Sequence, residues 1–580
     1  MLSELTITRS LSARMLFFAS AAITTAILWW GNGLAHLAST RGLSPIFFYL
    51  FTKHDIPEAS AMLVILIAAA LVPRQTRLLS YLRWAGDNIY TLAAGYGLIL
   101  CAGALFIYGN HPLSMDEYAI YFQSQAFAAG HLAGQVPPEL VDWLIPKGFQ
   151  NYFLNVSHAT GEVAGTYWPS YALLLTPFSW LGIPWACNPL LSACTLVAIH
   201  KLTLKVFGRG ETAGLAVLFT MASPEFFADG ISYYSMTAHL LANACFALLL
   251  IEATPRNAML AGLVGSIALT LHNPVPHMLF ALPWIAWLAS RPGGLRLLGC
   301  LLCGYMPLCL ILGVGWFWFS YELIHQSVAL TTHANILSSV PSPFALPSIA
   351  LLLARSIALA KIWLWSVPGL LLLAGLGAYR YRHISACRLL LASATLTFFG
   401  YLFVPLDQGH GWGFRYFHSA WLALPILAAG VLFPPSGAEV GPRYFQDLDT
   451  QAFVFACLAL TAIFGIGQRC MQIHELVLEI TSQQPRYAGT ERHIELIDTR
   501  FSFYGNDLVQ NHPLLRGNVI RMLSRGAAED ASMMHAYYPN LRRVFADRYG
   551  SVWSGGNAKY PPIGDLPPRR LKSVVVSPQG

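Results

Sequence analysis

The chain has 580 residues, of which 55% are hydrophobic and only 11% are charged, and its mean hydropathy is +0.52. A soluble protein of this length needs more charge to cover its surface, so the composition excludes a soluble enzyme. It indicates a membrane protein with many spanning helices.

Charged residues are distributed unevenly along the chain. Residues 468–580 hold 24 of them, against 39 in the preceding 467 residues. The boundary near Gln468 therefore predicts a change of solvent, with the first part of the chain in lipid and the last part in water. We expect a small α/β domain in this tail, with a disordered end from Ser554, where Pro, Gly and Ser are frequent.

Apolar runs of roughly 17–25 residues predict about thirteen transmembrane helices, so the expected fold is an all-α polytopic membrane protein with a small α/β extracytoplasmic C-terminal domain. A further apolar segment, 346–360, is either an extra span or a helix in the membrane interface. The spans are expected near 14–36, 56–73, 84–108, 183–204, 211–228, 236–253, 257–271, 275–290, 297–320, 361–379, 388–405, 417–434 and 450–467.

The orientation in the membrane follows from lysine and arginine. One set of loops holds fifteen of these residues and the opposite set holds at most six. Because cytoplasmic loops carry the excess of positive charge, the first set is expected inside. The N-terminus is then cytoplasmic, while the long loop 109–182 and the tail are extracytoplasmic. The first span lacks a small-residue cleavage site and is expected to stay as an anchor.

Two short patterns have the spacing of metal or nucleotide-sugar sites, and a simpler interpretation is favoured for both. Cys300 and Cys303 lie inside a hydrophobic helix without a second ligand pair, so they are expected to behave as small apolar residues. Asp447 and Asp449 stand in a short inner loop before the last span, which favours a solvated helix start.

The polar residues that stand out are the adjacent Asp116 and Glu117, near the start of the outer loop 109–182. Acids favour helix N-termini, so the pair could cap the helix that follows. Alternatively, the helix could hold the pair in position as reactive groups. An enzyme on the outer face cannot rely on ATP or nucleotide sugars, and its activated substrate must arrive in the membrane. The usual form is a sugar on a polyprenyl phosphate, whose transfer needs a base for the acceptor hydroxyl and cations for the phosphate.

Four segments follow one another along the chain: Asp116-Glu117-Tyr118, Tyr167-Trp-Pro-Ser-Tyr171, Ser235-Met-Thr-Ala-His239 and Gly411-Trp-Gly-Phe-Arg415-Tyr416. In this order they resemble the GT-C glycosyltransferases, and in particular bacterial relatives of the protein O-mannosyltransferases and of the lipid A aminoarabinose transferase. The resemblance covers roughly residues 84–435. Two departures are an added hairpin within 1–83 and the sequence Leu271-His272-Asn273-Pro274, where relatives often have Thr-Arg-Pro.

The resemblance implies roles for ten residues, and two further cations are weaker candidates. Asp116 would be the general base, and Glu117 would position it or a bound ion, so a divalent metal cofactor is left open. The donor phosphate would meet Arg415, whose guanidinium offers five donors, with Lys147 and His272 as further candidates and Arg355 and Lys361 as weaker ones. Interfacial anchoring is the competing interpretation of these cations and of the aromatic residues. The substrate-binding candidates are Tyr118, Tyr167, Tyr171, His239 and Tyr416.

The expected function is an integral membrane glycosyltransferase that moves a sugar, with inversion, from a polyprenyl-phosphate donor to a hydroxyl of a lipid, glycan or protein acceptor. A lipid-linked sugar flippase or an O-antigen ligase or polymerase is the alternative. Membrane lipids are expected partners, nucleic acids are not, and the expected location is the bacterial inner membrane. The expected domains are an N-terminal hairpin with a basic inner loop (1–83), a catalytic transmembrane domain (84–467) and an extracytoplasmic domain (468–580).

Overall fold

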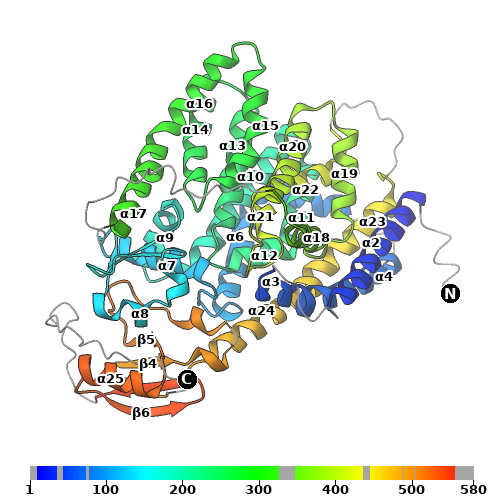
Figure 1. Ribbon diagram of the computed structural model, residues 1–580. Helices are drawn as coiled ribbons and strands as arrows, with labels where there is room; N and C mark the ends of the chain where they lie inside the picture. Colours follow the sequence, from blue (N-terminus) through cyan, green and yellow to red (C-terminus); the bar gives the residue numbers. More distant parts are fainter. Residues whose placement is uncertain are drawn as a thin grey trace. The chain divides into compact units, whose positions relative to one another are not determined.

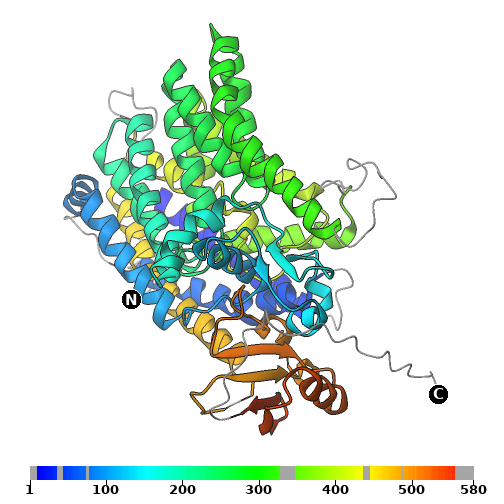
Figure 2. The same ribbon diagram turned by 90° about the vertical axis from the view of Figure 1, so that its left-hand side faces the viewer.

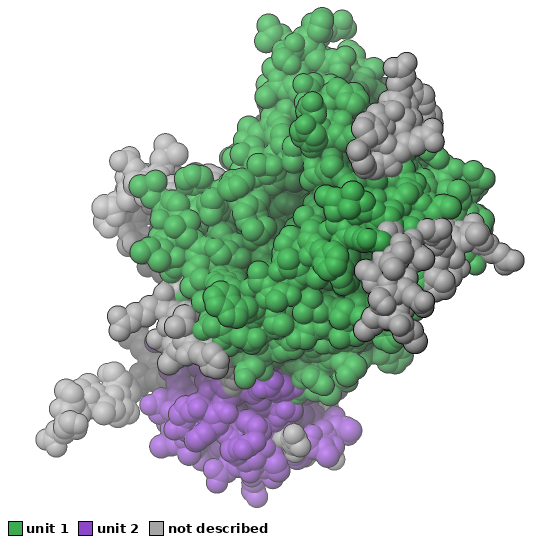
Figure 3. Space-filling model, turned by 90° about the vertical axis from the view of Figure 1, so that its right-hand side faces the viewer, with its two compact units in different colours: residues 1–124, 167–319, 330–478 green, residues 125–166, 320–329, 479–580 purple. Residues whose placement is uncertain are grey.

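The computed structural model describes residues 10–35, 43–72, 78–325, 346–435, 445–485, 487–502 and 504–555. The chain divides into two compact units (Figure 3). The first contains residues 1–124, 167–319 and 330–478, and the second contains 125–166, 320–329 and 479–580. The second unit therefore combines part of the long loop with the tail.

The first unit is built from helices (Figure 1). Long apolar runs form them because a helix satisfies its backbone hydrogen bonds internally, as the interior of a bilayer requires. The helices are α2 (Leu11–Ala35), α3 (Pro45–Leu50), α4 (Ile56–Leu71), α5 (Leu78–Asp87), α6 (Ile89–Phe106), α7 (Met115–Ala128), α9 (Ser170–Trp180), α10 (Cys187–Phe207), α11 (Gly210–Ala222), α12 (Pro224–Ile231), α13 (Met236–Leu250), α14 (Pro255–Leu269), α15 (Val275–Ala289), α16 (Gly294–Leu308), α17 (Trp316–His325), α18 (Ile349–Leu364), α19 (Leu370–Arg380), α20 (Ser385–Gly400), α21 (Arg415–His418), α22 (Ala423–Leu432), α23 (Leu448–Leu460) and α24 (Ile466–Thr481). The ends of α7, α17 and α24 belong to the second unit.

Within the described residues, seven helical segments are long and apolar enough to cross a membrane. Four shorter apolar helices, α11, α15, α19 and α22, coincide with other expected spans. The expected polytopic helical fold is thereby confirmed. The seven segments are Leu11–Ala35, Pro45–Leu71, Ile89–Phe106, Pro184–Phe207, Gly294–His325, Ser385–Phe403 and Leu448–Thr481.

One region differs from the expected succession of span and loop. The helices α12 and α13 are together apolar enough for one span, but the chain bends by 115° between them. All residues of the turn between them, expected as an outer loop at 229–236, are buried. Pro224 begins α12 and separates it from α11, so the apolar run 211–228 is divided between two helices.

The helices α14 and α16 lie side by side in both ribbon views (Figures 1 and 2). Two glycines permit this close approach. A Cβ atom on Gly262 would lie 2.0 Å from the carbonyl oxygen of Leu301, and one on Gly304 would lie 2.1 Å from that of Met259. Small residues at such crossings are typical of helix packing in membranes.

The second unit contains two small sheets. The first, of order β1-β3-β2, is antiparallel; the second, of order β5-β4-β7-β6, has a parallel pair in β4–β5 and antiparallel pairs elsewhere. The expected small α/β domain in the tail is confirmed, whereas residues 556–580 of its expected disordered end lie outside the described residues. The elements are β1 (Gly134–Gln135), α8 (Val141–Leu144), β2 (Leu154–Val156), β3 (Glu162–Gly165), β4 (His493–Ile497), β5 (Val519–Leu523), α25 (Ala527–Tyr537), β6 (Arg542–Asp547) and β7 (Gly550–Ser554).

The helix start expected at Asp447 and Asp449 is present, but Asp449 is buried, with an exposed fraction of 6%, and is not solvated as expected. All ten cysteines, including Cys300 and Cys303, are free. The side chain of Asp447 accepts a hydrogen bond from the backbone N–H of Thr450, so it caps α23 at its N-terminus.

Candidate active site

Asp116 and Glu117 lie in the first turn of α7, the position that acids favour, but their side chains have different partners. Nη2 of Arg415 lies 2.7 Å from Oδ2 of Asp116, and the Tyr167 hydroxyl donates a short hydrogen bond to Oδ1. The exposed fraction is 16% for the Asp116 side chain and 6% for that of Arg415. The structure thus joins a base candidate and a phosphate-binding candidate in one ion pair.

The loop before α21 holds Arg415 in position. Nε of Arg415 donates to the carbonyl of Gln408 at 3.1 Å, and Nη2 donates to the same oxygen. Nε2 of Gln408 in turn donates to the carbonyls of Gly411 and Gly413, at 3.2 and 3.0 Å. Gly411 has φ +144°, and a Cβ atom there would lie 2.8 Å from Cδ of Arg415. The loop therefore needs glycine at 411 to pack directly on the arginine.

Aromatic rings surround the ion pair. The guanidinium of Arg415 lies over the rings of Tyr234 and Tyr416, 4.9 and 5.6 Å from their centroids. The ring of Tyr167 stacks on His272 with centroids 3.8 Å apart. Stacking fixes both rings and directs the Tyr167 hydroxyl at Asp116.

The charge of Asp116 is set by these neighbours. Burial raises the pKa of Asp116, but the positive charge of Arg415, the nearby His272 and the Tyr167 hydroxyl outweigh it and hold this pKa below its ordinary value. Burial lowers the pKa of His272 to about 4, so this ring is neutral at pH 7. The site thus contains a carboxylate, a guanidinium and a neutral imidazole.

Glu117 is fully buried and serves as an acceptor for three groups. The Tyr108 hydroxyl and the backbone N–H of Tyr233 donate to Oε1, at 3.0 and 2.8 Å, and the backbone N–H of Leu113 donates to Oε2 at 2.9 Å. Burial raises the pKa of Glu117 to about 7, against the effect of these donors. Its bonds tie the start of α7 to the end of α6 and to the turn between α12 and α13.

The other predicted substrate-binding residues have mainly structural contacts. The buried Tyr118 packs edge-on against Phe122, and the hydroxyl of the buried Tyr171 donates to Oδ1 of Asn188 at 2.7 Å. His239 is fully buried within α13. The Tyr416 hydroxyl donates to the carbonyl of Asp407 at 3.0 Å, which holds its ring beside Arg415.

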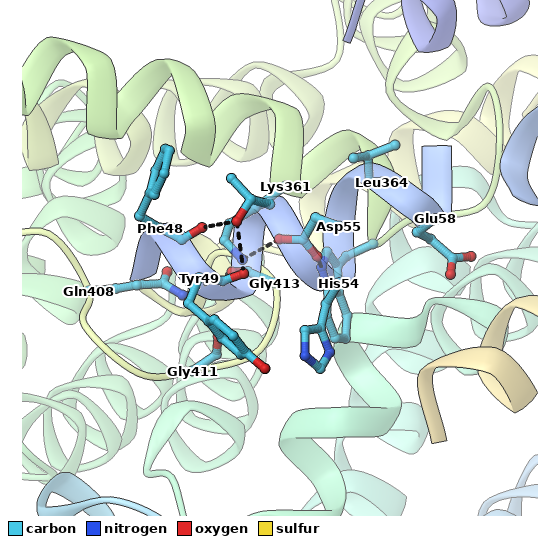
Figure 4. Close-up of polar contacts among 12 residues, drawn as sticks. Phe48, Tyr49, His54, Asp55, Glu58, Lys361, Leu364, Gln408, Gly411 and Gly413 are labelled. Atoms are coloured by element: carbon cyan, nitrogen blue, oxygen red, sulfur yellow. Dashed lines mark hydrogen bonds and ion pairs between the residues drawn. The ribbon is translucent and has the colours of Figure 1, made fainter. Parts of the chain in front are cut away.

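Lys147 belongs to the second unit, where Nζ lies 3.2 Å from Oδ2 of Asp142 and the side chain is 74% exposed. The two weaker candidates both have partners. Arg355 donates to the carbonyls of Tyr401, Val404 and Leu406. Nζ of Lys361 lies 2.5 Å from Oδ2 of Asp55. Figure 4 shows these two residues near Gln408 and Gly413 of the loop before α21.

Tyr234 and His410 belong to the site, although the sequence did not single them out. The Tyr234 hydroxyl lies 2.7 Å from Nδ1 of His410 and 2.9 Å from the Ser114 hydroxyl. Burial lowers the pKa of His410 to about 3, so it is neutral at pH 7. The sequence signal was present: His410 lies in the same loop as Arg415, and Tyr234 directly precedes Ser235 of the third segment.

The fold and this site define a polytopic, mainly helical membrane protein with an acid–arginine pair that joins the first turn of α7 to the start of α21. No protein-family model matches the chain, and no curated protein matches it. The chain is similar to solved structures of ArnT from Cupriavidus metallidurans. For ArnT bound to undecaprenyl phosphate the identity is 11%, the TM-score is 0.48, and 80% of this chain and 97% of that chain are covered. For its apo state the values are 12%, 0.46, 81% and 99%. Because both TM-scores lie below 0.5, the function proposed next rests on the residues of this chain.

Proposed function

We propose that this protein is an integral membrane glycosyltransferase that moves a sugar from a polyprenyl-phosphate donor to an acceptor hydroxyl on the extracytoplasmic face. The observation that carries the proposal is the Asp116–Arg415 ion pair, with Oδ2 and Nη2 2.7 Å apart. It combines the base that an alcohol nucleophile needs with the cation that a phosphate leaving group needs.

In the proposed reaction the acceptor hydroxyl attacks the anomeric carbon of the donor and loses its proton to the carboxylate of Asp116. The bond from the anomeric carbon to the phosphate oxygen breaks on the opposite side, and its electron pair leaves with the phosphate. Configuration is therefore inverted. Arg415 stabilises the charge that grows on the leaving oxygen, and its planar fork suits a phosphate.

The remaining groups position these two residues. The Tyr167 hydroxyl orients the carboxylate of Asp116, and the stack with His272 holds Tyr167 in place. Glu117 binds the backbone of Leu113 and Tyr233 and so fixes the first turn of α7. Asp116 keeps a partly exposed side chain through which an acceptor could reach it.

The test uses purified full-length protein in liposomes with a radiolabelled polyprenyl-phosphate sugar and extracts containing lipid, glycan and protein acceptors. Transfer of the label with release of polyprenyl phosphate supports the proposal, and the labelled product identifies the acceptor class. Movement of the labelled lipid across the bilayer without transfer would favour a flippase. Use of diphosphate-linked oligosaccharides alone would favour a ligase.

The variants Arg415→Lys and Arg415→Ala test the leaving-group role in the same assay. Arg415→Ala should lower kcat and weaken donor binding, because the charge on the leaving oxygen grows as the bond breaks. Arg415→Lys should recover only part of the activity, since a point charge cannot reproduce the bidentate fork. Unchanged donor kinetics in Arg415→Ala would contradict the role.

A further inference from the structure

A cluster of three ionisable side chains lies apart from the residues that the proposed reaction uses. Glu225 and Asp229 stand four residues apart on α12 and therefore on one face of that helix, and His418 is the last residue of α21. The exposed fraction of each side chain is 0%. Nδ1 of His418 lies 3.0 Å from Oδ2 of Asp229 and 3.6 Å from Oε1 of Glu225.

Asp229 and His418 lack the hydrogen bonds that buried polar groups require. Among the described residues, no hydrogen-bond partner reaches either carboxylate oxygen of Asp229 or either ring nitrogen of His418. The carboxylate of Glu225 is approached by the backbone N–H of Phe414. The two contacts of His418 with the acids are close but do not have the direction of a hydrogen bond. Buried charges are paired or bind metals in proteins, because an uncompensated charge is costly away from water.

The surroundings keep the cluster closed and direct its atoms inward. Gly413 has φ +54°, and a Cβ atom there would lie 2.6 Å from the carboxyl carbon of Glu225, so the loop packs directly on this acid. The ring of His418 is nearly parallel to Phe226 and to Trp421, with interplanar angles of 15° and 19°. One candidate ligand atom from each of the three residues lies within 4.8 Å of the others.

We propose that Glu225, Asp229 and His418 bind one divalent transition-metal ion that joins α12 to α21. Two carboxylates and an imidazole are ligands for zinc and for manganese, whereas the imidazole disfavours magnesium and calcium. The ion would neutralise the two acids and supply the partners that the oxygens of Asp229 and the ring nitrogen lack. Since α21 begins with Arg415, the ion would also fix the helix that carries this arginine.

Metal content measures the site without any assay of transfer. Full-length protein purified in detergent without chelators should contain about one equivalent of zinc or manganese by elemental analysis. His418→Gln and Asp229→Asn should each lower this to under about one tenth of an equivalent. The matched control is His200→Gln, which replaces another buried histidine, on α10, and should keep the wild-type content.

Cobalt provides the second measurement, and its wild-type result tests the site without any variant. After the native ion is removed with phenanthroline, added Co²⁺ should give visible d–d absorption in the wild type and in His200→Gln, but not in Asp229→Asn or His418→Gln. Wild-type protein that holds no metal as purified and shows no cobalt spectrum would overturn the proposal and leave two acids that share a proton. A loaded metal in a protein that transfers no sugar would refute the proposed function alone.

Discussion

Asp116 is the residue on which the proposed chemistry depends most. Asp116→Asn keeps the shape of the side chain but removes the base, so we expect kcat to fall by about 10²–10⁴-fold. The measurement is the transfer assay, together with a thermal unfolding curve that should show a folded protein. Asp142→Asn, which replaces an acid paired with Lys147 in the second unit, is the control and should retain activity. Near-normal turnover by Asp116→Asn would mean that the acid pair is only a helix cap.

The Tyr167 hydroxyl sets the pH range in which this base works. It donates to the ionised form of Asp116 and so helps to hold its pKa below the ordinary value. Tyr167→Phe should raise that pKa, while the ring can still stack on His272. Because the base must be deprotonated, the fall of kcat/KM at acid pH should begin at a higher pH in this variant than in the wild type. Superimposable acid limbs in the two pH profiles would argue against Asp116 as the titrating base.

At the scale of elements, a buried charge network connects the N-terminal hairpin to the rest of the first unit. Asp55 lies between α3 and α4, and its oxygens contact Lys361 of α18 and Arg469 of α24, with 2.5 and 3.0 Å between the nearest atoms. The indole of Trp365 donates to the same carboxylate at 2.6 Å. The hairpin is therefore joined to two distant helices by one side chain.

Asp55→Asn should leave the buried Lys361 without its counter-ion and Arg469 with Glu58, whose Oε2 lies 3.8 Å from Nε, as its remaining acid. Removing one partner of a buried pair costs about 3–5 kcal/mol, so the variant should unfold at a clearly lower temperature in detergent. Lys147→Met, which breaks an ion pair whose lysine side chain is 74% exposed, should change stability by no more than about 1 kcal/mol. Equal unfolding temperatures for the Asp55→Asn variant and the wild type would show that the network does not hold the hairpin.

The sequence predicted most helices but not their partners. Hydropathy indicates where α2, α6, α10 and α23 lie, because a spanning segment must be apolar along its length. The Asp116–Arg415 pair could not be predicted, since 299 positions separate the two residues and only folding brings them together. The burial of the turn between α12 and α13 could not be predicted for another reason. Its polar residues are typical of an exposed loop, but the fold encloses them.

At the scale of the whole molecule, the orientation in the membrane is still a prediction from the lysine and arginine bias. A membrane-impermeant maleimide applied to intact spheroplasts should label Lys147→Cys, whose position is exposed, and should not label Arg382→Cys, which is exposed in the loop after α19. The wild type, with ten free cysteines, gives the background. Labelling of position 382 alone would invert the topology and remove the site from the outer face.

The composition also predicts a change of solvent near Gln468, and this stays a prediction. The position lies in α24, a helix that continues to Thr481, and the second unit takes up the chain from residue 479. A helix can pass from lipid into water without a break, so a compositional boundary need not be a domain boundary. What composition could not indicate is that residues 125–166 of the long loop belong to the same unit as the tail.

The pairing of Asp116 with Arg415 has a kinetic consequence. In the ligand-free protein Asp116 is paired with Arg415, the cation that would bind the donor phosphate. An acceptor that binds before the donor would therefore find the carboxylate already in an ion pair. Donor binding would draw the guanidinium away and release the carboxylate. The two substrates would then add in a compulsory order, the lipid first.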